Sequence, residues 1–222
     1  MKNTKKTVYL CLALLVPVFL IFFFVAFAST RHTLPVFFAT DSIQTEREYI
    51  ITNAHTIPDY QLTDQNGTVF KSTDHDAEFK VYDFVFTRCG STCPKMTTQL
   101  VRVQEAFKND KDVVLISLTV DPEHDTSEVL QHYADQYNAI PGKWYFLTGL
   151  KDSIYTLGQN EFFLSAQQNK KDLTDFIHSD KVVLVDKNGW IRGYYNGTEE
   201  AEVDRLITEV KVLKKIEQDA KR

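Results

Sequence analysis

The feature that most constrains this chain is an uninterrupted apolar run over residues 8–28, VYLCLALLVPVFLIFFFVAFA, which contains no charged residue. As an α-helix the run would be about 32 Å long, enough to cross the hydrocarbon core of a bilayer. All the charged residues before it are lysines, whereas little positive charge follows it closely. Because positive charge stays on the cytoplasmic side, the pattern predicts a cytoplasmic tail over residues 1–7, a transmembrane anchor and an exported remainder.

A cleaved signal peptide is the alternative interpretation of the same segment. Ala26-Phe27-Ala28 has the small-x-small form of a cleavage site, but the apolar run is longer than the roughly 7–15 residues of a signal-peptide core. We therefore expect a retained anchor. In both cases the rest of the chain faces the periplasm or an equivalent oxidising space, and Cys11 is a small apolar residue of the anchor.

The remainder is predicted to be a stalk followed by one domain. Residues 29–54 show neither a helical nor a strand period, whereas residues 55–222 have a length typical of a single globular domain. The formal net charge is −5, and three lysines are the only charged residues of the first 28, which leaves −8 for the exported part. Such an acidic domain predicts no nucleic-acid partner.

Strand and helix patterns alternate through the domain. Its first element is predicted to be a β-hairpin, with strands at 60–63 and 68–70 joined by a tight turn in which Asn66 and Gly67 have positive φ angles. The further predicted strands are 80–87, 113–120, 144–149, 181–186 and 190–196, and the predicted helices end near 109 and 137, cover 152–159, and close the chain with Val203, Leu206, Val210 and Leu213 on one stripe. The 125–137 helix opens on a sequence typical of a capping box, Asp125-Thr126-Ser127-Glu128. This alternation predicts an α/β fold with helices on both faces of a sheet.

Two cysteines lie where such a fold places ligand sites. Cys89 follows the first buried strand, and Cys93-Pro94 opens the next helix. A helix N-terminus favours the thiolate, which is the reactive and metal-binding form. The three intervening residues bring the sulfurs close enough for a disulfide or for two ligands of one metal, and the spacing alone leaves both open.

A metal site would need a third ligand, and a histidine is the first candidate. His178 precedes the strand 181–186, on a loop that a thioredoxin-like arrangement would carry beside the cysteines. His124, in the turn DPEHDT, is a weaker candidate on the same grounds.

Three segments together resemble the Sco/SenC proteins, which are membrane-anchored, thioredoxin-like copper chaperones. They are TRCGSTCP from residue 87, TVDPEHDTSEVL from residue 119 and IHSDKVVLVDKNGWIRGYYNG from residue 177, and the resemblance spans roughly residues 55–215. It implies a thioredoxin-like fold with an added N-terminal β-hairpin. It also implies a copper site made by Cys89, Cys93 and His178.

The resemblance further implies what the protein works with. Copper, as Cu(I), Cu(II) or both, would come from a donor and pass to the copper-site subunit of a respiratory oxidase, or the thiols would reduce the cysteines of that binuclear centre. Since only the dithiol holds copper, a thiol reductant is also implied. Asp121 would support the metal ligands from the next layer of residues or contact a partner protein. A role as a turn residue before Pro122 explains it equally well. The chain departs from the family pattern at Gly90-Ser91-Thr92 and at His124, where the family usually has arginine.

An exported thiol:disulfide oxidoreductase is the main alternative, with Cys89 as nucleophile and Cys93 as resolving thiol. Enzymes of that type place a proline just before the strand beside the active site, whereas the last proline here is Pro141 and His178 occupies that loop. This favours metal binding over docking of a substrate disulfide. A redox sensor that uses the same pair is a third interpretation, and whether the protein is an enzyme stays open at this point.

Overall fold

The computed structural model describes residues 15–23, 34–44, 49–74, 77–164 and 179–220, which fall into two units, Met1–Thr33 and Leu34–Arg222. In the first unit, residues 15–23 are helical and exposed. Among the residues with a described structure, no helix has both the length and the apolar character needed to cross a membrane. Most of the predicted anchor lies outside them, so the anchor stays a prediction.

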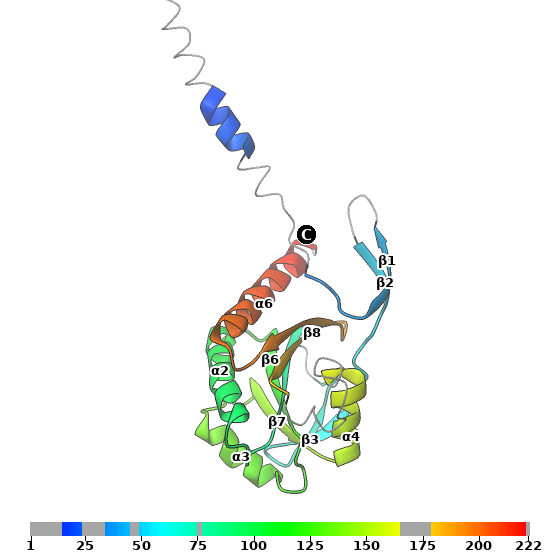
Figure 1. The fold of residues 1–222 in the computed structure, drawn as a ribbon, viewed down its shortest axis with the longest axis vertical. Helices are drawn as coiled ribbons and strands as arrows, with labels where there is room; N and C mark the ends of the chain where they lie inside the picture. Colours follow the sequence, from blue (N-terminus) through cyan, green and yellow to red (C-terminus); the bar gives the residue numbers. More distant parts are fainter. Residues whose placement is uncertain (1–14, 24–33, 45–48, 75–76, 165–178, 221–222) are drawn as a thin grey trace, which may run out of the picture. The chain divides into compact units, whose positions relative to one another are not determined.

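The second unit is built on a seven-stranded mixed sheet in the order β4-β3-β7-β6-β5-β8-β9 (Figure 1). Its centre consists of three parallel strands, β5 (Phe79–Val85), β6 (Val113–Thr119) and β7 (Trp144–Thr148). The flanking strands run antiparallel to their neighbours and are β3 (Gln61–Asp64), β4 (Val69–Lys71), β8 (Lys181–Asp186) and β9 (Ile191–Asn196). All seven strands were predicted within one or two residues.

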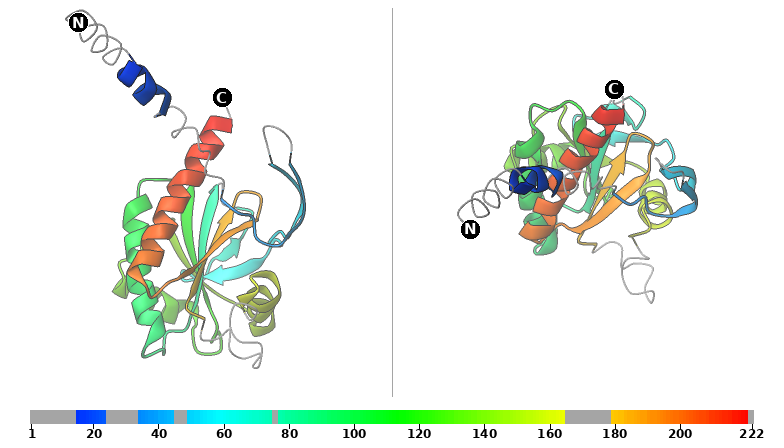
Figure 2. Two further views of the ribbon diagram at one scale, coloured as in Figure 1. Left: turned by 45° about the horizontal axis from the view of Figure 1, so that its top comes forward. Right: turned by 90° about the horizontal axis from the view of Figure 1, so that it is seen from above.

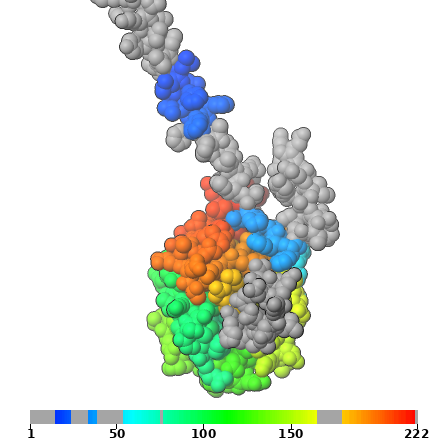
Figure 3. Space-filling model, in the orientation of Figure 1, coloured from blue at the N-terminus to red at the C-terminus, as the bar shows by residue number. Residues whose placement is uncertain are grey.

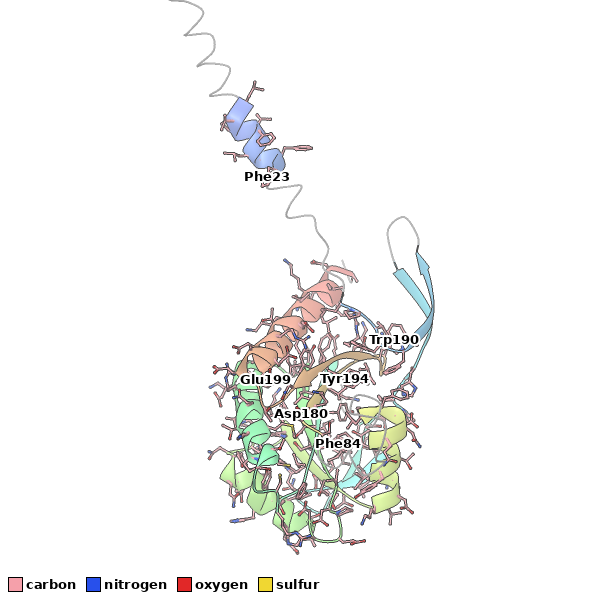
Figure 4. All side chains as sticks on the ribbon, viewed as in Figure 1. Phe23, Phe84, Asp180, Trp190, Tyr194 and Glu199 are labelled. Atoms are coloured by element: carbon pink, nitrogen blue, oxygen red, sulfur yellow. The ribbon has the colours of Figure 1, made fainter. Side chains whose placement is uncertain are left out.

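Helices cover both faces of the sheet, as predicted (Figure 2). On one face lie α2 (Thr92–Phe107), α3 (Ser127–Gln136) and α6 (Glu200–Ala220), whose buried stripes form a single apolar cluster with alternate residues of β5. On the other face lie α4 (Lys151–Thr156) and the π-helical turn η1 (Leu157–Glu161), which pack with a second cluster that includes Phe84 (Figure 4). The helices α2 and α6 contact each other, and the orange surface of α6 adjoins the green surface of α2 in the space-filling view (Figure 3).

Both hairpins of the sheet close with the same turn, built on an aspartate. Asp64 and Asp186 each end a strand, and the Oδ1 of each accepts hydrogen bonds from the backbone N–H groups two and four residues later. Gly67 and Gly189 have φ angles of 74° and 75°, whereas Asn66 does not have the positive φ angle that we predicted. That prediction was wrong because the turn is one residue longer than the two-residue type, and only its last residue needs the left-handed conformation.

The segment predicted to be a stalk contains two strands. β1 (Ala39–Gln44) and β2 (Tyr49–Ala54) pair only with each other, so the expected first strand at 60–63 is in fact the third. Ahead of them the chain is fixed to β9, since the Arg192 guanidinium donates to the carbonyl groups of Leu34 and Pro35. Two strands that pair only with each other need no long alternating pattern, which explains why the sequence did not reveal them.

Candidate thiol and metal site

The two cysteines lie together at the junction of β5 and α2. Cys89 is half-buried in the turn after β5, and Cys93, the second residue of α2, is only 5% exposed. The backbone N–H of Cys93 donates to the Cys89 sulfur at 3.4 Å. Ser91, which precedes α2, makes no side-chain capping bond. The Cys89 sulfur instead accepts a hydrogen bond from a backbone N–H group of the first helical turn. Both side chains are free thiols.

The surroundings of the two thiols shift their pKa values in opposite directions. Partial burial works against ionisation of Cys89, but hydrogen bonds from Cys93 and from the backbone N–H groups of Ser91 and Thr92 outweigh it and lower its pKa. Burial raises the pKa of Cys93 to about 12, and the neighbouring Cys89 adds to the effect. Cys89 is therefore the sulfur that ionises first and meets solvent, as a nucleophile or first metal ligand must.

The turn that follows β6 lies beside the cysteine loop. Arg88, next to Cys89, donates to the Asp121 carboxylate at 2.5 Å in a partly exposed ion pair. This contact brings the DPEHDT turn next to the cysteine loop, and the role of Asp121 stays a prediction.

Asp125 is the buried centre of this region. Its carboxylate accepts hydrogen bonds from Thr87 N at 3.1 Å, Thr87 Oγ1 at 2.5 Å and Thr119 Oγ1 at 2.5 Å, and it bonds His124 Nδ1 at 2.9 Å. Within the predicted capping sequence it is Thr126 that caps the helix, since its side chain accepts from Val129 N. Asp125 was not predicted as a site residue, because its position next to a helix start is typical of a local capping role.

Asp121, His124 and Asp125 also place potential ligand atoms within 4.8 Å of one another. However, Asp121 is paired with Arg88 and both oxygens of Asp125 already accept hydrogen bonds from threonines. These contacts describe a hydrogen-bonded turn whose carboxylates are already engaged, and the choice between His124 and His178 stays a prediction.

His178 lies outside the described residues. The first residues described after it, Ser179 and Asp180, precede β8, and β8 runs antiparallel to β5 with Val183 opposite Tyr82. The start of β8 is therefore at the edge of the sheet where β5 ends and the cysteine loop begins. Asp180 (Figure 4) is fixed there because its carbonyl group accepts from Gly197 N at 2.7 Å.

Comparison with known proteins identifies the family. The family model for SCO1/SenC matches residues 49–214. This chain belongs to the SCO1/SenC family. The match extends over the region in which the sequence resemblance was found.

Individual relatives agree with this family. The SCO1 protein homolog of Bacillus subtilis is 30% identical over 153 residues, which cover 68% of this chain and 79% of that protein. The solved structure of BsSco, described as a member of the Sco family of cytochrome c oxidase assembly proteins with a disulfide switch, is 30% identical and superposes with a TM-score of 0.60 over 71% of this chain and 92% of that one. The copper-bound structure of Bradyrhizobium japonicum ScoI, 23% identical with a TM-score of 0.51 over 68% of this chain and 98% of that one, shares the fold. The predicted Sco-type thioredoxin-like fold is confirmed.

Proposed function

We propose that this protein binds one copper ion through Cys89, Cys93 and His178 and delivers it to the binuclear copper site of a cytochrome c oxidase, or reduces the cysteines of that site. The observation that carries the proposal is the pair of free thiols at the start of α2. The pKa of Cys89 is lowered, whereas the pKa of Cys93 is raised. Two sulfur ligands with one imidazole suit Cu(I), and a set of three leaves the ion open for transfer. Sco proteins that were crystallised with copper support this choice of metal.

The location proposed for this activity is the outer face of a membrane. The apolar run over residues 8–28 would anchor the chain, with the domain in the periplasm or an equivalent space. An oxidising space would convert the dithiol to a disulfide, so the cycle requires a thiol reductant as well as a copper donor.

Asp121 is proposed to support the metal ligands indirectly, through its ion pair with Arg88. It holds the Arg88 guanidinium beside Cys89, so Asp121→Asn would release Arg88 and lower the affinity for copper about tenfold. Because the ion pair is partly exposed, the same change should alter the free energy of unfolding by less than about 1 kcal/mol. An unchanged copper affinity would instead assign Asp121 to the turn alone.

The test is an anaerobic titration of the reduced full-length protein, in detergent, with Cu(I) against a competing chelator. Cys89→Ser, Cys93→Ser and His178→Ala are each expected to weaken one-to-one binding, whereas His132→Ala, an exposed histidine of α3 that bonds Gln136, should not. A matching His124→Ala variant decides between the two candidate histidines. Binding that is indifferent to His178 would refute the proposed ligand set.

A thiol:disulfide oxidoreductase remains the second candidate, favoured by the same division of acidities between Cys89 and Cys93. It predicts repeated reduction of protein disulfides by the membrane-bound protein with an exported thiol donor. Slow turnover together with tight Cu(I) binding would leave copper delivery as the function.

A further inference from the structure

Leu150, between β7 and α4, is an exposed apolar residue at a position that favours a polar one. Its side chain is 77% exposed, more than that of any other large apolar residue described in this unit. It stands at the N-cap of α4, with an extended backbone and no capping hydrogen bond from its side chain. A serine or threonine would stabilise the helix there, as Thr126 does at the start of α3. An apolar residue retained at such a position is expected to serve an interaction.

The backbone on both sides holds Leu150 in place. Before it, Gly149 packs so closely against β3 that a Cβ there would lie 2.6 Å from Leu62 Cδ2. After it, the Leu150 carbonyl group accepts a hydrogen bond from Ile154 N at 3.1 Å, and the Ile154 side chain is fully buried. The exposed leucine is therefore presented by a loop that is fixed at both ends.

This loop lies at the same edge of the sheet as the cysteines. The strands β5, β6 and β7 are parallel and adjacent, so the segments that follow them meet at one edge. Asp121, in the segment after β6, pairs with Arg88, the neighbour of Cys89. Glu123, in the same segment, pairs at 3.5 Å with Lys151, the first residue of α4. These ion pairs join the exposed leucine and the outer thiol into one continuous surface.

A groove of about 430 Å³ lies beside the β7–α4 loop, between residues 58–62 and the segment from α4 to η1. Its apolar lining includes Leu62, the residue that packs on the start of the loop. Its charged lining residues are Asp59, Asp152 and Glu161, and none of the described residues that line it is a lysine or an arginine. A negatively charged groove with an apolar part favours a positively charged, partly apolar segment.

We propose that Leu150 and this acidic groove form the docking surface for the protein partner that meets Cys89. The partner presents a segment that combines lysine or arginine with an apolar contact for Leu150. The apolar contact supplies affinity, and the carboxylates favour the approach of a basic surface over an acidic one. The proposal rests on the thiol site of the proposed function, since it places the reacting group of the partner at Cys89.

The test measures docking through disulfide exchange at Cys89 of the reduced full-length protein in detergent. The probes are four synthetic peptides of equal length, each with one cysteine held as a mixed disulfide with thionitrobenzoate. Two carry a Lys-Leu-Lys segment, before or after the cysteine, and two carry Glu-Leu-Glu at the same places. The Cys89 thiolate attacks the peptide sulfur, a new disulfide forms, and the coloured thionitrobenzoate thiolate leaves. The dependence of the rate on peptide concentration gives the Kd of docking and the limiting rate of exchange separately.

The wild type should dock one of the lysine peptides about tenfold more tightly than its glutamate counterpart. The double variant Asp59→Asn, Asp152→Asn should lose this preference, and Leu150→Ser should weaken docking of the same peptide about tenfold. The limiting rate should stay unchanged in both, because neither variant alters the surroundings of the thiol. Ile216→Ser, which replaces an exposed apolar residue of α6, is the matched control and should dock like the wild type.

The variant Leu150→Ser has a second readout that separates docking from folding. Serine is a preferred N-cap residue, so the midpoint of thermal unfolding should rise by about 2 °C while docking weakens. Equal docking of lysine and glutamate peptides by the wild type, wild-type docking by Leu150→Ser, or a lower midpoint for that variant would overturn the proposal. Failure of the wild type to bind Cu(I) would refute the copper assignment alone, because the docking constants are measured by thiol exchange.

Discussion

Thr87 and Asp125 are joined by two hydrogen bonds, one from the backbone N–H and one from the hydroxyl group of the threonine to the two oxygens of the buried carboxylate. Thr87 lies two residues before Cys89, and Asp125 also receives the hydroxyl of Thr119 at the end of β6. The cysteine loop is therefore fixed to the neighbouring strand by a single carboxylate that is shielded from water.

Asp125→Asn should destabilise the domain by about 3 kcal/mol, because the amide nitrogen offers hydrogens to groups that are themselves donors. Urea denaturation followed by fluorescence measures the change. The control is Glu123→Gln, an exposed residue of the same turn, which should change the free energy of unfolding by less than about 0.5 kcal/mol. Equal stabilities for the two variants would contradict the role given to Asp125.

Alkylation of the reduced, folded protein should distinguish the two thiols. A pKa of about 12 leaves Cys93 with about a thousandfold less thiolate than an ordinary cysteine, whereas the pKa of Cys89 is lowered. Iodoacetamide at pH 7 should therefore label Cys89 first, as peptide mapping would show. In urea both residues should react alike, and equal rates in the folded protein would refute the assigned environments.

The buried Asp83 predicts a specific dependence of stability on pH. Its pKa rises from an ordinary value of 3.8 to about 7 on folding, so the folded state holds the proton more tightly than the unfolded state. The stability linked to this group is fully present below about pH 4 and is lost as the pH rises to about 7, for a total of about 4 kcal/mol. Asp83→Asn removes this loss, so the variant should be more stable than the wild type at pH 8. Parallel stability curves for both proteins between pH 4 and pH 8 would contradict the raised pKa.

The two equivalent turns offer a matched pair of substitutions. Gly67→Ala should cost about 1 kcal/mol, because φ is positive there but a new Cβ would meet no atom within 4 Å. Gly189→Ala should cost clearly more, because its Cβ would lie 2.7 Å from Thr56 Cγ2 and 3.4 Å from the Ile57 carbonyl oxygen. Thermal unfolding of the two variants compares them directly, and a smaller loss for Gly189→Ala would be inconsistent with the packing of the residues before β3 against this turn.

The fold followed from local patterns that the structure preserves. The apolar residues Met96, Leu100, Val103 and Phe107, and the stripe Val203, Leu206, Val210 and Leu213, are all buried on one face of their helices. The cysteine pair was found because its location depends on the order of strand and helix alone. These features repeat at short intervals along the chain, so sequence carries them directly.

The surroundings of the site did not follow, because they depend on contacts between distant residues. Asp125 accepts a hydrogen bond from Thr87, which lies far earlier in the chain. Asp83 on β5 accepts one from Ser117 on the adjacent strand β6. The available signal was a charged residue inside the apolar strand KVYDFVFT, which a buried strand does not ordinarily contain. Its meaning required knowledge of which helix covers that face.

The unequal exposure of Cys89 and Cys93 also governs the order of events at the site. A partner of protein size meets only the outer sulfur, since the inner one is covered by the first turn of α2 and the core. Any copper ion or thiol partner that binds the site would therefore reach the Cys89 sulfur first. Another thiol would likewise have to react at that sulfur before it could reach Cys93. Selectivity for a partner would then depend on the residues that surround the Cys89 sulfur.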